Sequence, residues 1–529
     1  METTRHPVVM IGLDAAEIDV INRLISEGRL PHLARLRQDG WCGKLRADPA
    51  SFLSMVWPTF SSAQPMGHHA WYYNKLWRPE RSQLEYVSPD WLPIGNFVRD
   101  LPPDLRVAVL DLPFAADAPV GLNGLYLNGW QCHDDFGKQE SPTGLRAELE
   151  RRHGKPRMVP EVFGPQTTRT LRELRAMVCA SDAQFGDVCR DVLGREAWDL
   201  FLAVFGSTHR GSHYLWDLSQ VDLQGTDPEA RRELEGALAE CFESADRALG
   251  RILELVGEEA RILVFALHGM GPNRGWFEYL PRLLDQIHRG GGAAEPKKGL
   301  LFRLKKVLPW TLVRQVTRRI PHSWNKALVP LWSRRMYDWG STRYWALPTD
   351  HNGYIRVNLE GRDARGIVRP DDLPRVYEEV RAGLMSFRDS TTGRPIVSDV
   401  VLTDQAVGKD APRRDQLPDM VVLWRDEVSV ADVEGVTSDR YGEIRWGKGG
   451  RFPSGRSGNH TDHGWLVAKG PGLAQGNSED VHDIADLIPT AFRWLGIPVP
   501  SHYVGRPIPG LTEDDVEAVA KEAGSGHRG

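Results

Sequence analysis

Short apolar runs recur along the chain, and several of them end at a glycine, an aspartate or a histidine. Continuous apolar runs of about four to eight residues are typical of strands that are covered on both faces of a sheet. The pattern therefore predicts buried strands at "HPVVMIGLDA", "RVAVLDLP", "GLYLNGW", "WDLFLAVFG", "ARILVFALHG", "DMVVLW" and "GWLVAKG".

Between several of these runs the apolar residues recur with helical spacing. They do so from Ile18 to Ile25, where Gly28 and then Pro31 interrupt the pattern, and again along "EARRELEGALAECFESADRALGRILELV". Strands that alternate with helices predict an α/β fold, with a doubly wound and mostly parallel sheet flanked by helices. In such sheets ligands bind at the carboxyl ends of the strands.

Residues 276–345 break this alternation. They hold "GGGAAEPKKG" and then a basic, tryptophan-containing stretch, which predicts an insertion of short helices that caps the site. The alternatives are a solvated amphipathic surface and a contact with a membrane surface. We divide the remainder into a first part of the core at 1–275, a second part at 346–515 and a flexible C-terminal tail at 516–529.

Composition narrows the class of protein. The chain has 529 residues, of which 41% are hydrophobic and 26% charged, as in ordinary globular proteins, and its net charge of -5 gives no support to nucleic acid binding. Five scattered cysteines without CxxC spacing favour a reducing compartment over a disulfide framework. No signal peptide or membrane-spanning stretch is evident, so we predict a cytoplasmic protein without a membrane partner. Its oligomeric state leaves no signal in the sequence.

Four predicted strand ends carry residues that bind metals. Asp14 follows the first strand, His209 and His213 follow the strand "WDLFLAVFG", His268 follows "ARILVFAL", and His460 precedes "GWLVAKG". Two histidines four residues apart share one face of a helix, so both imidazoles can reach one cation. The other interpretation of these histidines is a structural role in loops.

The chemistry of these side chains indicates the kind of metal. Neutral imidazole suits zinc and other late transition metals, and a carboxylate adds a hard oxygen ligand. We therefore predict a divalent transition metal, with Zn²⁺ preferred.

A hydroxyl-rich segment, "PASFLSMVWPTFSSAQPMGHHAWYY", supplies candidates for a nucleophile. A hydroxyl beside a divalent metal loses its proton more easily and becomes a usable nucleophile. The alternative is that these hydroxyls cap backbone amides in a loop and a helix start. The segment has no GxSxG elbow and the chain has no GxxxxGK[ST] loop, which disfavours an α/β-hydrolase and a P-loop kinase.

The order of these segments resembles the alkaline phosphatase superfamily, and within it the type I phosphodiesterase/nucleotide pyrophosphatase branch. The resemblance rests on "VVMIGLDA", "LISEGRLPHLARLRQDGWCGKLRA", "VWPTFSSAQPMGHHAWYY", "NGYIRVNLEGRDARGIV" and "HDIADLIPTAFRWLGIPVPSHYVGRPI". It implies two divalent metals, commonly zinc, and a Thr or Ser that attacks phosphorus to form a covalent intermediate, which water then hydrolyses. It also implies that Asp14 is the first metal ligand and that His213, His268 and His460 are histidine ligands.

The chain departs from the family pattern at one ligand of the first metal. The family usually has Asp-x-x-x-His where this chain has His209 and His213. The resemblance therefore implies a site of three imidazoles, which His460 completes. Three neutral imidazoles form a good zinc site with one open position.

A second departure affects the other metal. The family usually has Asp-His-Gly where this chain has Leu267, His268 and Gly269. The second site then keeps only Asp14, His268 and the nucleophile, so we expect it to be weak or empty. Loss of two carboxylates raises the formal charge of the centre by about two units and draws in anionic esters more strongly.

Alignment on "WPTF" selects the nucleophile. It places the family's hydroxyl three or four residues before Trp57, at Leu53 or Ser54. Leu53 has no hydroxyl, so Ser54 is the predicted nucleophile, with Ser51 second. Thr59 has a family-like neighbourhood but lies too far along the helix.

Asn128 and His133 in "LNGWQCHD" are predicted to line the substrate side, with a plain loop role as the alternative. Together these features predict a metal-dependent hydrolase or transferase of small anionic phosphoester-type substrates, which are phosphodiesters, phosphomonoesters or sulfate esters. The alternatives are a sulfo- or phospho-group transferase of a specialised biosynthetic pathway and a non-catalytic metal-binding relative.

Overall fold

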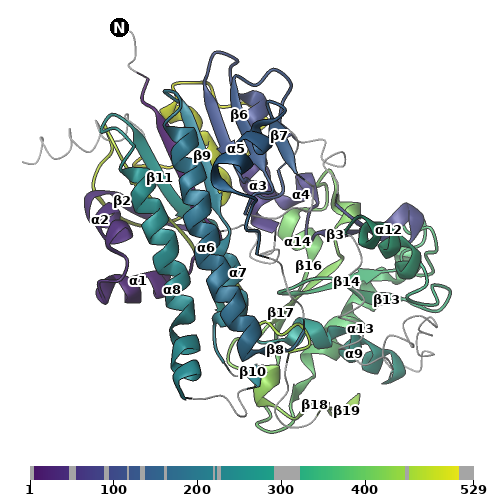
Figure 1. Cartoon of the computed structure of the whole chain (residues 1–529). Helices are drawn as coiled ribbons and strands as arrows, with labels where there is room; N and C mark the ends of the chain where they lie inside the picture. Colours follow the sequence, from purple (N-terminus) through teal and green to yellow (C-terminus); the bar gives the residue numbers. More distant parts are fainter. Residues whose placement is uncertain are drawn as a thin grey trace, which may run out of the picture.

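Figure 1 shows a computed structural model of the whole chain. The structure describes residues 5–46, 55–87, 95–115, 118–131, 138–159, 164–218, 221–222, 228–290, 322–446 and 452–511.

The core is a sheet of nine strands in the order β22-β2-β21-β11-β1-β9-β5-β6-β7. Five of its neighbouring strand pairs in the described ranges are parallel and three are antiparallel. This confirms the predicted α/β fold with a mostly parallel, doubly wound sheet. The strands are β1 (Val8–Leu13), β2 (Trp41–Arg46), β5 (Val107–Leu110), β6 (Gly124–Asn128), β7 (Gln139–Ser141), β9 (Leu200–Phe205), β11 (Arg261–Ala266), β21 (Gly464–Lys469) and β22 (Gly476–Asp483).

Alternation of side chains along the strands builds an apolar core on each face of the sheet. In β1, Val8 and Met10 join one core cluster, whereas Val9, Ile11 and Leu13 join another. The helices that pack on the first cluster are α3 (Val56–Ser62) and α15 (Leu487–Trp494). The second face carries α1 (Ile18–Ser26), α2 (Pro31–Asp39), α5 (Leu145–His153), α6 (Thr168–Leu193) and α8 (Pro228–Leu253).

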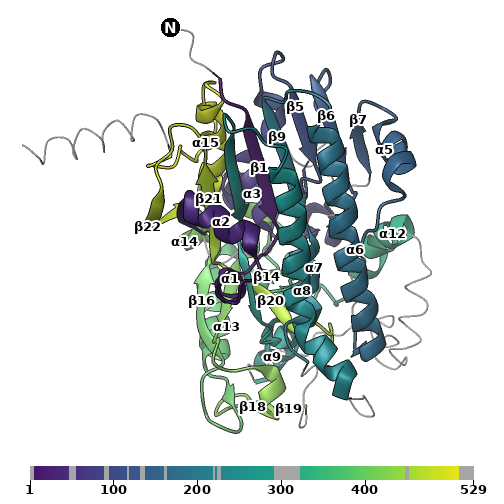
Figure 2. The same ribbon diagram turned by 60° about the vertical axis from the view of Figure 1, so that its left-hand side comes forward.

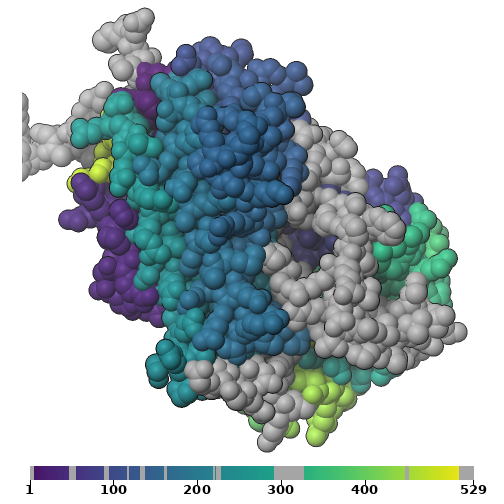
Figure 3. All heavy atoms as spheres, in the orientation of Figure 1, coloured from purple at the N-terminus to yellow at the C-terminus, as the bar shows by residue number. Residues whose placement is uncertain are grey.

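The long helices α6 and α8 lie side by side over the second face (Figures 1 and 2). Their blue and teal atoms dominate the surface that Figure 3 turns toward the viewer. This layer covers the middle strands and leaves the carboxyl ends of β1, β9 and β11 together at one edge, because these neighbouring strands run parallel. The edge at which these three strands end is therefore the position at which the sheet is predicted to bind ligands.

The first helices form where their spacing predicted them. Helix α1 ends at Ser26, and Gly28 adopts a left-handed φ of 72°, a conformation that favours glycine. Pro31 then opens α2 as its first residue, where the missing N–H of proline costs no hydrogen bond.

The described residues between 276 and 446, here the second subdomain, carry a second sheet beside the nine-stranded one and share part of its apolar core. Its four-stranded antiparallel sheet has the order β13-β14-β17-β16, and the predicted strand "DMVVLW" is β17 in this sheet rather than in the nine-stranded one. A third apolar cluster joins this sheet to its helices. The elements are α9 (Trp276–Gly290), α12 (His322–Ser333), β13 (Tyr344–Leu347), β14 (Gly353–Val357), α13 (Leu373–Met385), β15 (Arg388–Asp389), β16 (Val397–Leu402), α14 (Thr403–Val407), β17 (Met420–Trp424), β18 (Gly435–Ser438) and β19 (Gly442–Arg445).

Most of the basic stretch that led to the predicted cap lies at 291–321, outside the described residues, as does the predicted tail at 516–529. The domain boundaries at 275, 345 and 515 stay predictions. The short elements that complete the core are α4 (Met66–His69), β3 (Lys75–Arg78), β4 (Gln83–Tyr86), β8 (Gln166–Thr167), α7 (Ser207–Leu215), β10 (Val221–Asp222), β12 (Gly269–Pro272) and β20 (Gly458–Thr461). Among the described helices, none combines the length and apolar character needed to cross a bilayer.

Candidate metal centre

Asp14 stands at the carboxyl end of β1 and is held from several sides. Its backbone N–H donates to Phe205 O at 2.9 Å, and its carbonyl accepts from Thr208 Oγ1 at 2.6 Å. Its carboxylate accepts a 2.8 Å hydrogen bond from Trp57 Nε1 on α3 and is only 2% exposed. This carboxylate is thus fixed in place at the edge where the strands end.

Helix α7 begins directly after β9 and carries His209 and His213 one turn apart. The two Nε2 atoms lie 2.9 Å from each other. His213 Nδ1 lies 3.0 Å from Gly458 O, which requires its proton on Nδ1 and leaves the lone pair of Nε2 free. His209 Nδ1 lies 3.2 Å from Asp14 Oδ2. The 2.9 Å contact is then a hydrogen bond that His209 Nε2 donates to His213 Nε2, and a cation shared by the two nitrogens would replace the proton between them.

His460 reaches the same place from β20. Its ring centroid lies 5.1 Å from that of His209 and 5.0 Å from that of His213. One ligand nitrogen from each of the three histidines falls within 4.8 Å of the other two. We call these three residues the histidine trio. The structure brings them together from helix α7 and from a strand about 250 residues later, as the sequence predicts.

His268 and Asp14 lie beside the trio. His268 Nε2 is 3.6 Å from Asp14 Oδ1, and its Nδ1 is 3.3 Å from His460 Nδ1. Leu267, the residue before it, is 1% exposed and belongs to the same apolar cluster as Trp57 and Phe265. The pair of Asp14 and His268 therefore adjoins a hydrophobic side chain at the position where the resemblance implies a carboxylate.

Burial favours the neutral form of His268 and His460. It lowers the pKa of His268 below the ordinary value, and it lowers the pKa of His460 much further, with the neighbouring histidines acting in the same direction. Neutral imidazoles retain the lone pair that a metal needs. The electrostatics of the cluster thus favour binding of a cation over binding of protons.

A further histidine near the centre was not predicted. His351 lies in the connection between β13 and β14, next to Asp350, whose carbonyl accepts from Asn459 Nδ2 and whose carboxylate is 3.4 Å from Arg456 Nη1. Burial lowers the pKa of His351 to about 4, and the field of His268 also lowers it. The second subdomain thus places an imidazole near enough to His268 for the two rings to affect each other's protonation. The available signal was "TDHNG", a polar turn between two apolar runs.

Several predicted residues lie outside the described ranges, namely Ser51, Ser54 and His133. Met55, which follows Ser54, is the N-cap of α3, and Trp57 on this helix contacts Asp14. The first described turn of α3 is therefore next to the centre.

Thr59 and Asn128 are described, and no contact joins either of them to the trio. Thr59 Oγ1 is 3.1 Å from His69 Nε2, and His69 Nδ1 accepts from Trp71 N, so the ring donates its Nε2 proton to Thr59 and does not remove one from it. Asn128 Oδ1 accepts from Leu112 N at 2.9 Å, and its amide donates to Tyr126 Oη at 2.9 Å. These bonds favour structural roles for both residues.

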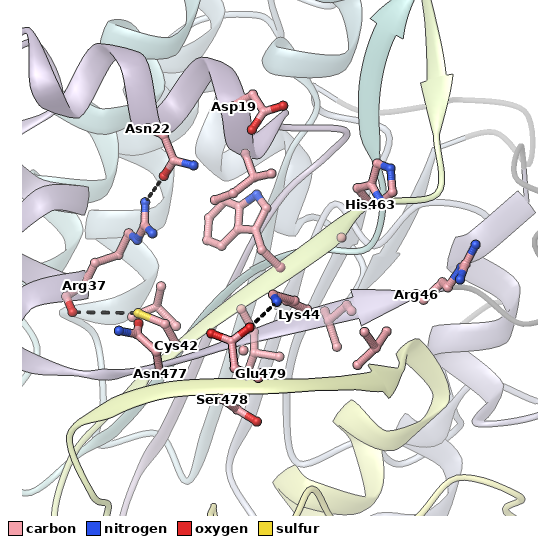
Figure 4. Close-up of a pocket in the computed structure, with 18 of the residues that line it drawn as sticks. Asp19, Asn22, Arg37, Cys42, Lys44, Arg46, His463, Asn477, Ser478 and Glu479 are labelled. Carbon is pink, nitrogen blue, oxygen red and sulfur yellow. Dashed lines mark hydrogen bonds and ion pairs between the residues drawn. The ribbon is translucent and has the colours of Figure 1, made fainter. Parts of the chain in front are cut away.

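A groove of about 680 Å³ runs along α1, β2 and the turn between β20 and β21 (Figure 4). None of the predicted metal ligands lines it. Its lysine, Lys44, pairs with Glu479 at 2.7 Å, and Arg46 pairs with Asp462. An anionic substrate would have to displace these carboxylates, so the trio is the better candidate for the site of chemistry.

A mixed nine-stranded sheet flanked by helices, with a buried cluster of histidines at its carboxyl edge, defines an alkaline phosphatase-like α/β protein. The solved structure of wild-type alkaline phosphatase PafA has this fold, with 14% identity and a TM-score of 0.52 over 96% of this chain and 99% of that one. Phosphonoacetate hydrolase from Sinorhizobium meliloti 1021, in complex with phosphonoformate, is 15% identical with a TM-score of 0.48 over 93% of this chain and 95% of that one. At these identities the likeness concerns the fold alone.

The sequence identifies the family more closely. The model of the type I phosphodiesterase / nucleotide pyrophosphatase family matches residues 8–466, and the chain belongs to this family. It is accordingly an enzyme of the phosphoester hydrolase type. No curated protein sequence matches it significantly.

Proposed function

We propose that the protein is a metal-dependent hydrolase or transferase of small anionic phosphoester-type substrates, which are phosphodiesters, phosphomonoesters or sulfate esters. The observation that carries the proposal is the convergence of His209, His213 and His460, whose ligand nitrogens lie within 4.8 Å of one another. Membership of the family supports the reaction class, and the trio offers three ligands for the metal that we expect the reaction to need.

The donor set of the trio fits a divalent transition metal. The two Nε2 atoms lie 2.9 Å apart, and the Nδ1 proton of His213 is held by Gly458 O, so loss of the one proton between them would place both nitrogens within reach of one cation. Zn²⁺ is our preferred ion, because three neutral imidazoles with one open position are a common catalytic zinc arrangement. Asp14 and His268 would hold a second ion less firmly, since Leu267 supplies no oxygen.

When bound, the metal supplies Lewis acidity toward the ester oxygens and lowers the pKa of a nearby hydroxyl. The chain supplies the rest. Trp57 holds the Asp14 carboxylate with its indole N–H, which fixes α3 against the centre. We propose that Ser54, two residues before this helix, attacks the phosphorus or sulfur atom and loses its proton, while the bond to the ester's alcohol breaks and the alcohol leaves after taking up a proton. Water or another acceptor then attacks the same atom and releases the group from the serine, which recovers its proton.

Two readings compete with hydrolysis. Transfer to an acceptor other than water is the first, as in a sulfo- or phosphotransferase of a biosynthetic pathway. A non-catalytic metal-binding relative is the second, and the apolar Leu267 beside His268 is the observation that favours it.

Metal analysis together with an ester panel tests the proposal. We expect close to one transition metal ion per chain by mass spectrometry, hydrolysis of bis-p-nitrophenyl phosphate, and loss of this activity in EDTA with recovery on adding Zn²⁺. Bound metal without turnover of phosphodiesters, phosphomonoesters or sulfate esters would support the non-catalytic reading. Turnover that is indifferent to EDTA in metal-free protein would contradict the proposal.

A further inference from the structure

A buried carboxylate behind the metal centre belongs to Glu17, three residues after Asp14. Its side chain is buried, with 6% of the residue exposed. Oε1 accepts from Asp19 N and thereby caps α1. Oε2 accepts a 2.8 Å hydrogen bond from Met270 N and a 3.2 Å hydrogen bond from Thr461 Oγ1.

These hydrogen bonds connect the segments that carry separate ligands. Met270 on β12 is two residues after His268, and Thr461 on β20 directly follows His460. In the antiparallel pair of β12 and β20, Met270 lies opposite His460. One carboxylate from the loop after β1 therefore binds both strands of the hairpin-like pair that brings the two histidines together.

The space around this carboxylate explains a glycine in the chain. A Cβ atom at Gly269 would lie 2.1 Å from Glu17 Oε2 and 2.7 Å from Thr461 Oγ1. Both contacts are far below any tolerated separation, so the carboxylate and the hydroxyl occupy the room that a side chain would need. Gly269 permits the close approach of Glu17 to the strand that follows His268.

The charge of Glu17 is not neutralised by a partner cation. In the described part of the chain it forms no ion pair, and its donors there are backbone N–H groups and a hydroxyl. Burial raises the pKa of Glu17 above its ordinary value. The carboxylate therefore acts on the centre through its hydrogen bonds to the two strands that carry His268 and His460.

We propose that Glu17 is a positioning residue of the metal centre, which holds the strands of His268 and His460 in place and thereby strengthens metal binding. This inference rests on the proposed function, because it requires that the trio binds a metal. It differs from a purely structural role in its effect on metal affinity.

The test compares Glu17→Gln with a matched control, Glu278→Gln. Glu278, on α9, is a partly buried glutamate whose carboxylate accepts from Ser454 N at 3.0 Å and from Ser454 Oγ at 2.8 Å. Both substitutions replace one oxygen of a hydrogen-bonded carboxyl group by an amide nitrogen and keep the shape of the side chain. The dissociation constant for Zn²⁺ is measured by competition with a chelator, and the melting temperature is measured on metal-free protein.

We expect Glu17→Gln to raise the Zn²⁺ dissociation constant about 10- to 100-fold, the range typical of lost outer hydrogen-bond partners of metal ligands. Glu278→Gln should leave this constant unchanged while it lowers the melting temperature to a similar degree. With Co²⁺ bound, Glu17→Gln should also shift the visible absorption bands, because the imidazoles change orientation.

Thr461→Val provides a milder variant for the case in which Glu17→Gln fails to fold. It removes one donor to Glu17, so it should raise the Zn²⁺ dissociation constant by less than Glu17→Gln does. Unchanged Zn²⁺ affinity in both variants, with normal uptake by the wild type, would overturn the role of Glu17 alone. Absence of metal uptake by the wild type would instead overturn the proposed function.

Discussion

The two halves of the metal centre differ in how completely the chain builds them. The histidine trio has three imidazoles whose ligand nitrogens lie within 4.8 Å, and the carbonyl of Gly458 orients one of them. The neighbouring half has Asp14 and His268 at 3.6 Å, with Leu267 in the apolar core beside them. The comparison teaches that one metal position can be complete while the adjacent one lacks a ligand, within a single fold.

The largest effect is expected from His213→Ala. This change removes a member of the trio, so it should lower Zn²⁺ affinity by more than the about 10- to 100-fold that loss of an outer partner costs, and activity should disappear with the metal. Mass spectrometric metal analysis of the purified variant measures this. His482→Ala is the control, because His482 is buried on β22 against Trp41. If the His213→Ala variant keeps its full metal content, the metal does not depend on the trio, and the distinction between a complete and an incomplete metal position is wrong.

Ser54→Ala should separate chemistry from metal binding. We expect a loss of turnover on the order of 10⁴-fold or more, because the nucleophile is gone while the imidazoles are untouched. Thr59→Val serves as the control, since Thr59 Oγ1 is engaged by His69 and should be dispensable for turnover. Full activity in Ser54→Ala would transfer the role to Ser51, Thr59 or water.

Leu267→Asp is designed to complete the weaker half. The new carboxylate would lie next to His268, so the metal content should rise from about one to about two ions per chain when Zn²⁺ is supplied. Leu267→Asn, which has nearly the same shape without the charge, should stay at one. If both variants bind as much metal as the wild type, another residue already completes the second metal position, and the proposed difference between the two positions is wrong.

The smallest expected effect is on the pH dependence of stability, and it comes from His69. This buried histidine is not one of the predicted metal ligands, so it shows what burial alone does to an imidazole of this protein. Burial lowers the pKa of His69 to about 3, so the unfolded chain binds the extra proton first as the pH falls below about 6.5. The contribution of His69 to the free energy of unfolding is therefore largest above pH 6.5, and it declines by about 1.4 kcal/mol per pH unit toward pH 4.

The measurement is urea unfolding of metal-free wild type and His69→Gln between pH 7 and pH 4.5. The difference between the two proteins isolates His69, because the carboxyl groups of Asp182 and Glu278 have pKa values raised to about 6 and about 7 and titrate in the opposite sense. A difference in unfolding free energy that stays constant over this range would contradict the assignment.

The six inner strands β21, β11, β1, β9, β5 and β6 could be predicted from their apolar runs, whereas β2, β7 and β22, which have no such run, could not. Gly28 and Pro31 marked the boundary between α1 and α2. The histidines could be predicted as a group because His209, His213 and His268 follow strands whose carboxyl ends share one edge, and His460 precedes β21, an antiparallel strand that starts at the same edge. The assignment of "DMVVLW" to a second sheet could not, since a buried strand has the same pattern in either sheet.

Other parts of the centre depend on contacts that no local pattern reports. His351 reaches the centre through the bonds of its neighbour Asp350 to Arg456 and Asn459, which lie about a hundred residues away in the chain. Glu17 looks like a helix cap in the sequence, and only the fold shows its second oxygen bound to β12 and β20.

Anomalous X-ray scattering from crystals of the purified, metal-loaded protein tests the central claim most directly. We predict a strong peak about 2.0–2.1 Å from one nitrogen each of His209, His213 and His460, and a weak peak or none between Asp14 and His268. Imidazoles of the trio that turn away from one another, with no peak among them in metal-loaded crystals, would contradict the account.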